Sequence, residues 1–118
     1  MNPFKPTTLR AIAQTHGTPI WVYDAATIRT RIAALRAFDT IRFAQKANSN
    51  THILRLMRQE GVLVDAVSLG EIERALAAGY SDFKWMAQDP DLETLRKHPG
   101  YEEVRAKIKT TKPKVKPA

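Results

Sequence analysis

Lys46 directly follows a short apolar stretch and precedes a polar run that begins a helix. Residues 40–44 alternate between apolar and polar types with period two, which predicts a strand that ends just before this lysine. In parallel α/β folds, active sites are built from loops at the carboxyl ends of strands. A lysine between Ala44 and Ala47 could be desolvated enough to act as the neutral amine nucleophile of Schiff-base chemistry. The alternative is a lysine that reaches past the strand into solvent.

Two carboxylates follow at informative positions. Asp65 interrupts an apolar stretch between Val64 and Ala66, where an unpaired buried carboxylate would be costly, so we expect it to have a partner. That partner is a basic group, a neighbouring helix terminus or solvent. Glu71 lies three residues after Ser68, which is the spacing of a capping box at the start of a helix. Glu71 is therefore either a helix-capping residue or a site carboxylate.

The elements that would position these residues alternate along the chain. A short helix is expected over residues 8–14, followed by strands over 19–23, 40–44 and 62–67. Helices are expected to begin after Asp24, after Ser49 or Asn50, and after Ser68, because these side chains can cap them. Strand and helix alternating in this way predict an α/β fold with a parallel sheet, either a barrel or a doubly wound sheet.

Composition limits what the chain can be. At 118 residues it is too short for a complete (β/α)8 barrel, which needs about 250. It lacks cysteine and any apolar run of membrane-spanning length, so we expect a soluble, cytoplasmic chain. The net charge of +7 owes much to lysines near the C-terminus, and no aromatic–basic pattern predicts specific nucleic-acid binding. The three histidines lack metal-ligand spacing, so no metal site is expected.

The residues around Lys46 also resemble a known family. The segments Phe43-Ala44-Gln45-Lys46-Ala47-Asn48-Ser49-Asn50 and Val64-Asp65-Ala66-Val67-Ser68-Leu69-Gly70-Glu71 are similar to the beginning of the diaminopimelate decarboxylases. These belong to the pyridoxal-phosphate decarboxylases with an alanine-racemase-like barrel. The resemblance covers about residues 18–80 and implies an incomplete set of the first βα units of a pyridoxal-phosphate-binding, TIM-type (β/α)8 barrel.

The resemblance also implies roles for individual residues. Lys46 would form the Schiff base with pyridoxal 5'-phosphate, and Asp65 would lie near the Schiff-base nitrogen in an ion pair with Lys46. Glu71 would be an active-site carboxylate, and Ala44 would contact the cofactor. The implied activity is decarboxylation of meso-diaminopimelate to L-lysine, with a small amino acid as substrate. The family's glycine-rich phosphate loop and C-terminal β-domain have no counterpart in this sequence.

From these observations we expect four segments. Residues 1–17 form an N-terminal helical segment, and residues 18–81 form the partial barrel. Residues 82–109 form a helical segment of different origin, which weakly resembles the closing helices of tetratricopeptide-repeat proteins, and 110–118 form a disordered basic tail.

The interpretation is a truncated or fused decarboxylase-like chain that is inactive on its own. We expect exposed sheet edges and apolar helix faces to favour self-association or a partner chain. The alternatives are a helical protein-interaction module and a non-functional product of gene rearrangement.

Overall fold

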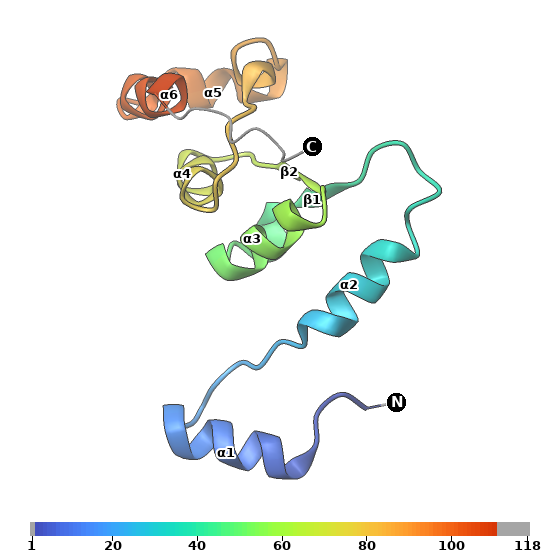
Figure 1. Cartoon of the computed structure of the whole chain (residues 1–118). Helices are drawn as coiled ribbons and strands as arrows, with labels where there is room; N and C mark the ends of the chain where they lie inside the picture. Colours follow the sequence, from blue (N-terminus) through green and yellow to red (C-terminus); the bar gives the residue numbers. More distant parts are fainter. Residues whose placement is uncertain (1, 111–118) are drawn as a thin grey trace. The chain divides into compact units, whose positions relative to one another are not determined.

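The computed structural model describes residues 2–110, which fall into two compact units divided between Asp39 and Thr40 (Figure 1). The first unit contains helices α1 and α2, and the second contains the sheet and all remaining helices. Most of the basic tail expected over 110–118 lies outside the described residues. Among residues 2–110, no helix is both long enough and apolar enough to cross a membrane.

The first unit consists of α1 (Pro6–His16) and α2 (Ala25–Ala33). Helix α1 has proline in its first turn and ends at Gly17, whose φ of 81° lies in the left-handed region that favours glycine. Helix α2 is capped as predicted, because the Asp24 carboxylate accepts a hydrogen bond from the Thr27 N–H at 2.7 Å.

The prediction of a strand over residues 19–23 is wrong. In the structure these residues form no strand, and Trp21 is 87% exposed. Strands depend on a hydrogen-bonded neighbour, and β propensity alone does not supply one. The described part of the chain therefore contains two strands where the sequence predicts three.

The second unit begins with a βαβ arrangement. Strand β1 (Arg42–Ala44) lies parallel to β2 (Leu63–Asp65), and α3 (Thr51–Gln59) connects them. A single 3-10 turn, η1 (Gln45–Ala47), follows β1. Helix α3 is capped by Asn50, whose Oδ1 accepts from the His52 N–H at 2.9 Å. The predicted parallel α/β fold is thus confirmed.

Helix α4 (Leu69–Ala77) follows β2 and begins at Ser68, as predicted. It is followed by the 3-10 turns η2 (Lys84–Ala87) and η3 (Pro90–Leu92), then by α5 (Glu93–Arg96) and α6 (Tyr101–Thr110). The side chain of Asp89 caps η3 by accepting a hydrogen bond from the Asp91 N–H at 3.0 Å, and Pro90 lies at the first position of this turn. Helix α6 packs against α4.

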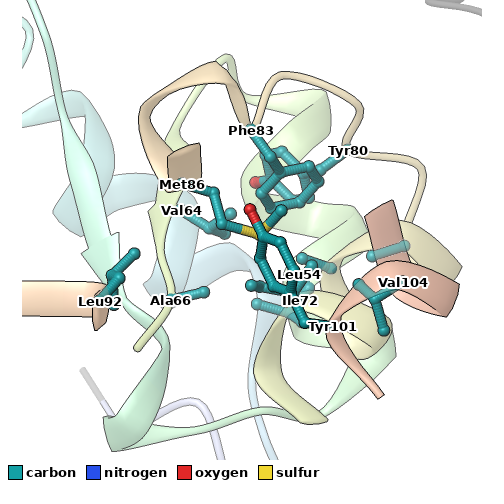
Figure 2. Packing of buried hydrophobic residues seen from close by; sticks show 12 residues of the cluster. Leu54, Val64, Ala66, Ile72, Tyr80, Phe83, Met86, Leu92, Tyr101 and Val104 are labelled. Atoms are coloured by element: carbon teal, nitrogen blue, oxygen red, sulfur yellow. The ribbon is translucent and has the colours of Figure 1, made fainter. Parts of the chain in front are cut away.

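One hydrophobic cluster joins the βαβ part to the C-terminal segment. Figure 2 shows Met86, Tyr101 and Val104 lying beside Leu54 of α3 and Ile72 of α4. The buried members of the cluster are Leu54, Val64, Ala66, Ile72, Ala75, Ala78, Tyr80, Phe83, Met86, Leu92, Tyr101 and Val104.

This cluster corrects one expectation. The sequence predicts open apolar helix faces, but α6 packs against α4, and Leu54 of α3 and Ile72 of α4 share one buried cluster with five residues of the C-terminal segment. The expectation of open sheet edges holds for the described residues, because the sheet has two strands. The separate origin of residues 82–109 stays a prediction.

Candidate functional site at the carboxyl edge of the sheet

The two strands place the predicted site residues at one edge. In the parallel register Ala44 lies opposite Asp65, so both strands end at the same level. Lys46 follows two residues later in the η1 turn. Loops that carry functional groups gather at this edge of parallel sheets. The fold therefore brings the backbone positions of Lys46 and Asp65 to the same edge, as the strand order predicts.

The side chain of Lys46 is exposed, as is Ala44 before it. Within residues 2–110, the amine forms no ion pair or hydrogen bond. Of the two alternatives that the sequence leaves open for Lys46, the described chain shows the solvent-exposed one. Desolvation needs apolar atoms on several sides, and two alanine methyl groups do not provide them.

Asp65 is exposed because it alternates with two buried neighbours, Val64 and Ala66. Its position on the solvent side of β2 removes the cost of burying a carboxylate, so it needs no protein partner. The ion pair expected between Asp65 and Lys46 does not form among the described residues. Exposed pairs of this kind contribute little, so nothing local forces the two side chains together.

Glu71 is half-buried and acts at the start of α4. Its N–H donates to Ser68 Oγ at 3.2 Å, and its Oε2 accepts from the Val67 N–H at 2.6 Å. This is a variant of the predicted capping box, because the carboxylate bonds the residue before the cap. Capping occupies one carboxylate oxygen. The family role of Glu71 stays a prediction, as do those of Lys46, Asp65 and Ala44.

Sequence reasoning missed Gln45. Its side chain is fully buried, and its Nε2 donates to the main-chain oxygen of Glu71 at 2.6 Å. The period-two pattern of residues 40–44, continued by one step, puts residue 45 on the same side as Phe43. That continuation was the available signal, but glutamine is mostly a surface residue type.

A groove of about 380 Å3 lies near this edge, between the first turn of α4 and the segment of η3 and α5. The polar residues among those that line it are Ser68, Asp91, Thr94 and His98. Neither Lys46 nor Asp65 nor Glu71 lines it. The candidate site is therefore the open strand edge, distinct from this groove.

Comparison with known proteins identifies the family. The sequence model of the "pyridoxal-dependent decarboxylase, pyridoxal binding domain" family matches residues 25–94. This range covers more than half of the chain and includes the whole strand edge. The chain belongs to the pyridoxal-dependent decarboxylases. The match runs past Ser81, where the sequence predicts a change of origin, and that boundary stays a prediction.

Individual relatives agree with this assignment. The diaminopimelate decarboxylase of Streptomyces coelicolor is 75% identical over 72 residues, which cover 61% of this chain and 16% of that protein. The diaminopimelate decarboxylase of Escherichia coli K12 is 74% identical over 65 residues, covering 55% and 16%. A crystal structure of diaminopimelate decarboxylase matches with a TM-score of 0.62 and 59% identity, over 72% of this chain and 20% of that chain.

These matches confirm the resemblance to the diaminopimelate decarboxylases and the α/β fold that this resemblance implies. Residues 25–94, which include α2 of the first unit and most of the second unit, correspond to part of the pyridoxal-binding domain, and the family implies pyridoxal phosphate as cofactor. The chain spans about a sixth to a fifth of the length of these relatives.

The residues present fit the aldehyde end of pyridoxal phosphate. The reaction with an aldehyde needs a primary amine that solvent and ligand can reach. Lys46 is such an amine, exposed and without a partner among the described residues. Its neighbour Gln45 is buried and hydrogen-bonded to the Glu71 main-chain oxygen, so the amine extends from a turn that is tied to α4.

Proposed function

We propose that the strand edge of this chain is the lysine-bearing part of a diaminopimelate decarboxylase-type site. In this proposal Lys46 holds the aldehyde carbon of pyridoxal phosphate, and Asp65 and Glu71 lie around the amine as carboxylates of the same edge. Ala44 leaves room beside the amine. The relatives are named for diaminopimelate, and we propose a small amino acid of this kind, meso-diaminopimelate, as the substrate.

One observation carries the proposal. The parallel register sets Ala44 against Asp65, so an amine and a carboxylate follow neighbouring strand ends. The similarity to diaminopimelate decarboxylases spans this same part of the chain.

The chemistry divides between cofactor and chain. When bound, pyridoxal phosphate supplies an electron sink for the electron pair left behind when a carboxylate departs. Lys46 would hold the cofactor through its side-chain amine. Asp65, being anionic, favours a protonated nitrogen beside it, and solvent weakens that effect while the edge is open.

The test is to incubate the purified chain with pyridoxal phosphate, reduce with borohydride and map the modified lysines by mass spectrometry. We expect saturable labelling at Lys46 above that of the other lysines, and its loss in Lys46→Ala. Labelling spread evenly over all lysines would contradict the proposal.

We propose further that the chain alone releases no carbon dioxide from meso-diaminopimelate. In support, the edge is open to solvent, and catalysis of this kind depends on a water-excluded, preorganised site. Release of carbon dioxide above the level of the Lys46→Ala variant, measured with labelled substrate, would overturn this second statement.

The alternative of a helical interaction module finds less support. The apolar residues that such a module would present, Tyr101 and Val104 of α6, are buried in the chain's own cluster. A gene-rearrangement product is a statement about origin, and a genomic locus with a complete decarboxylase gene elsewhere would favour it.

A further inference from the structure

Gln45 is buried in a way that its side-chain chemistry does not favour. Its exposed fraction is 0%, and its Oε1 has no hydrogen-bond partner among residues 2–110. A buried acceptor without a partner costs about 1–3 kcal/mol, whereas an apolar side chain of the same shape avoids that cost. Core filling alone is therefore a poor account of a glutamine at this position.

The other end of the amide makes a specific connection. Nε2 donates to the Glu71 main-chain oxygen at 2.6 Å and so joins the turn after β1 to the first turn of α4. A second, longer bond runs in parallel, from Arg74 Nη1 to the Ser49 oxygen at 3.4 Å. The first bond is shorter and partly buried, whereas the second is exposed, so the first is the stronger constraint on the turn.

Gln45 also organises the turn through its main chain. Its carbonyl oxygen accepts from the Asn48 N–H at 3.0 Å and from Ser49 Oγ at 3.2 Å. A 3-10 turn has three residues, so adjacent side chains point about 120° apart. With Gln45 directed inward, Lys46 is directed away from the core, which agrees with its exposure.

We propose that Gln45 is the positioning residue of the candidate site. Its buried amide holds the Lys46 turn against the first turn of α4, which keeps the amine at the strand edge close to the helix that carries Glu71. The effect of Gln45 on cofactor attachment at Lys46 rests on the proposed function. The role of the Gln45–Glu71 hydrogen bond in holding the turn does not depend on that function.

The experiment compares the full chain with Gln45→Met, which keeps the length of the side chain and removes its polar atoms. Tyr80→Phe is the matched control, because it also removes a buried side-chain bond to a main-chain oxygen, from Tyr80 Oη to Val62 at 2.7 Å. Two quantities are measured. They are the share of borohydride-trapped pyridoxal phosphate found on Lys46, and the amide hydrogen exchange rate of Asn48.

In Gln45→Met we expect exchange at Asn48 to rise about three- to tenfold, the range that one net hydrogen bond represents. The Lys46 share of trapped cofactor should fall by about threefold or more on the same basis. Tyr80→Phe should change neither quantity, although its stability falls. A merely structural role for Gln45 would make the two variants behave alike, and that result overturns the proposal.

The proposed function of Lys46 and the positioning role of Gln45 can be disproved independently. If the unmodified chain traps no excess cofactor on Lys46, the proposed function fails, and exchange at Asn48 alone decides whether Gln45 holds the turn. Unchanged exchange in Gln45→Met overturns the positioning role even where trapping occurs. If Gln45→Met does not fold, Gln45→Asn replaces it, since its shorter amide stays polar but cannot span to the Glu71 oxygen.

Discussion

Tyr80 shows how a single buried polar group makes stability depend on pH. Its hydroxyl donates to the Val62 oxygen at 2.7 Å, and burial raises the pKa of Tyr80 to about 12, with the charge of Arg58 acting in the opposite direction. The unfolded chain loses this proton near pH 10 and the folded chain retains it to about 12. The unfolded state therefore binds fewer protons in this window, and stability falls as pH rises through it.

We expect Tyr80→Phe to lower the free energy of unfolding by about 0.5–1.5 kcal/mol at pH 9, the net value of one hydrogen bond. At pH 11 the difference from the unmodified chain should shrink, because only the chain with Tyr80 loses stability through this group. Urea denaturation at both pH values measures the difference. An equal difference at pH 9 and 11 would show that Tyr80 does not titrate in this way.

Lys46 is the opposite kind of residue, exposed and without a partner in the described chain. We expect Lys46→Ala to leave the free energy of unfolding within about 0.5 kcal/mol of the original, as for other surface substitutions. The same variant should lose the specific cofactor labelling. A large loss of stability in urea denaturation would mean that Lys46 serves the fold, and would weaken the assignment to a site.

At the scale of elements, α4 has one glycine in its first turn and another just after its end, and the two have different roles. Gly79, after its end, has φ of +95°, and an added Cβ would lie 3.2 Å from Arg58 Cζ. Gly70, in its first turn, has open space around the same position. Position 79 therefore needs glycine, and position 70 does not.

We expect Gly79→Ala to destabilise the chain by about 1–2 kcal/mol, the cost of left-handed backbone in an L-residue. Gly70→Ala should be neutral or stabilise by up to about 1 kcal/mol, since alanine favours helix. Thermal and urea denaturation of the pair provide the measurement. Equal effects of the two substitutions would contradict the assigned backbone conformations.

The start of helix α2 depends on the Asp24 cap, and this dependence varies with pH. Hydrogen bonds from Thr27 to the Asp24 carboxylate hold the pKa of Asp24 below its ordinary 3.8. The capping contribution is thus present above that pH and is lost as pH falls through the lowered value.

We expect α2 to fray at acid pH in the unmodified chain, visible as faster amide exchange at Thr27 after correction for intrinsic rates. Asp24→Asn should keep a cap and lose this dependence on pH, because the amide accepts a hydrogen bond without titrating. Acid fraying that is the same in both chains would assign the effect to another group.

At the scale of the whole molecule, the C-terminal segment is part of the core of residues 40–110. Phe83, Met86, Leu92, Tyr101 and Val104 supply five of the twelve buried residues of the cluster (Figure 2). Each large side chain contributes about 1.5–3 kcal/mol on burial, and small domains have only about 5–15 kcal/mol of net stability.

We therefore expect a chain ended after Ser81 to be unfolded, whereas a chain that begins at Thr40 keeps its fold. Circular dichroism and the dispersion of amide proton signals distinguish the two outcomes. If a chain of residues 1–81 folds cooperatively, residues 82–110 are not required for the stability of the partial barrel.

The local features were predictable from sequence alone because short-range rules govern them. The side chains of Asp24, Asn50 and Ser68 cap helices, as the sequence predicts. The parallel βαβ order and the placement of Lys46 at a strand end follow from alternation and spacing.

Tertiary structure alone decided what each side chain faces. The stretch around Trp21 has strand propensity but no pairing partner, and Asp65 is exposed between two buried neighbours. The amide of Gln45 meets Glu71 across 26 positions of sequence. Contacts between distant segments depend on how the elements pack, and residue types and their spacing do not encode that packing in any local pattern.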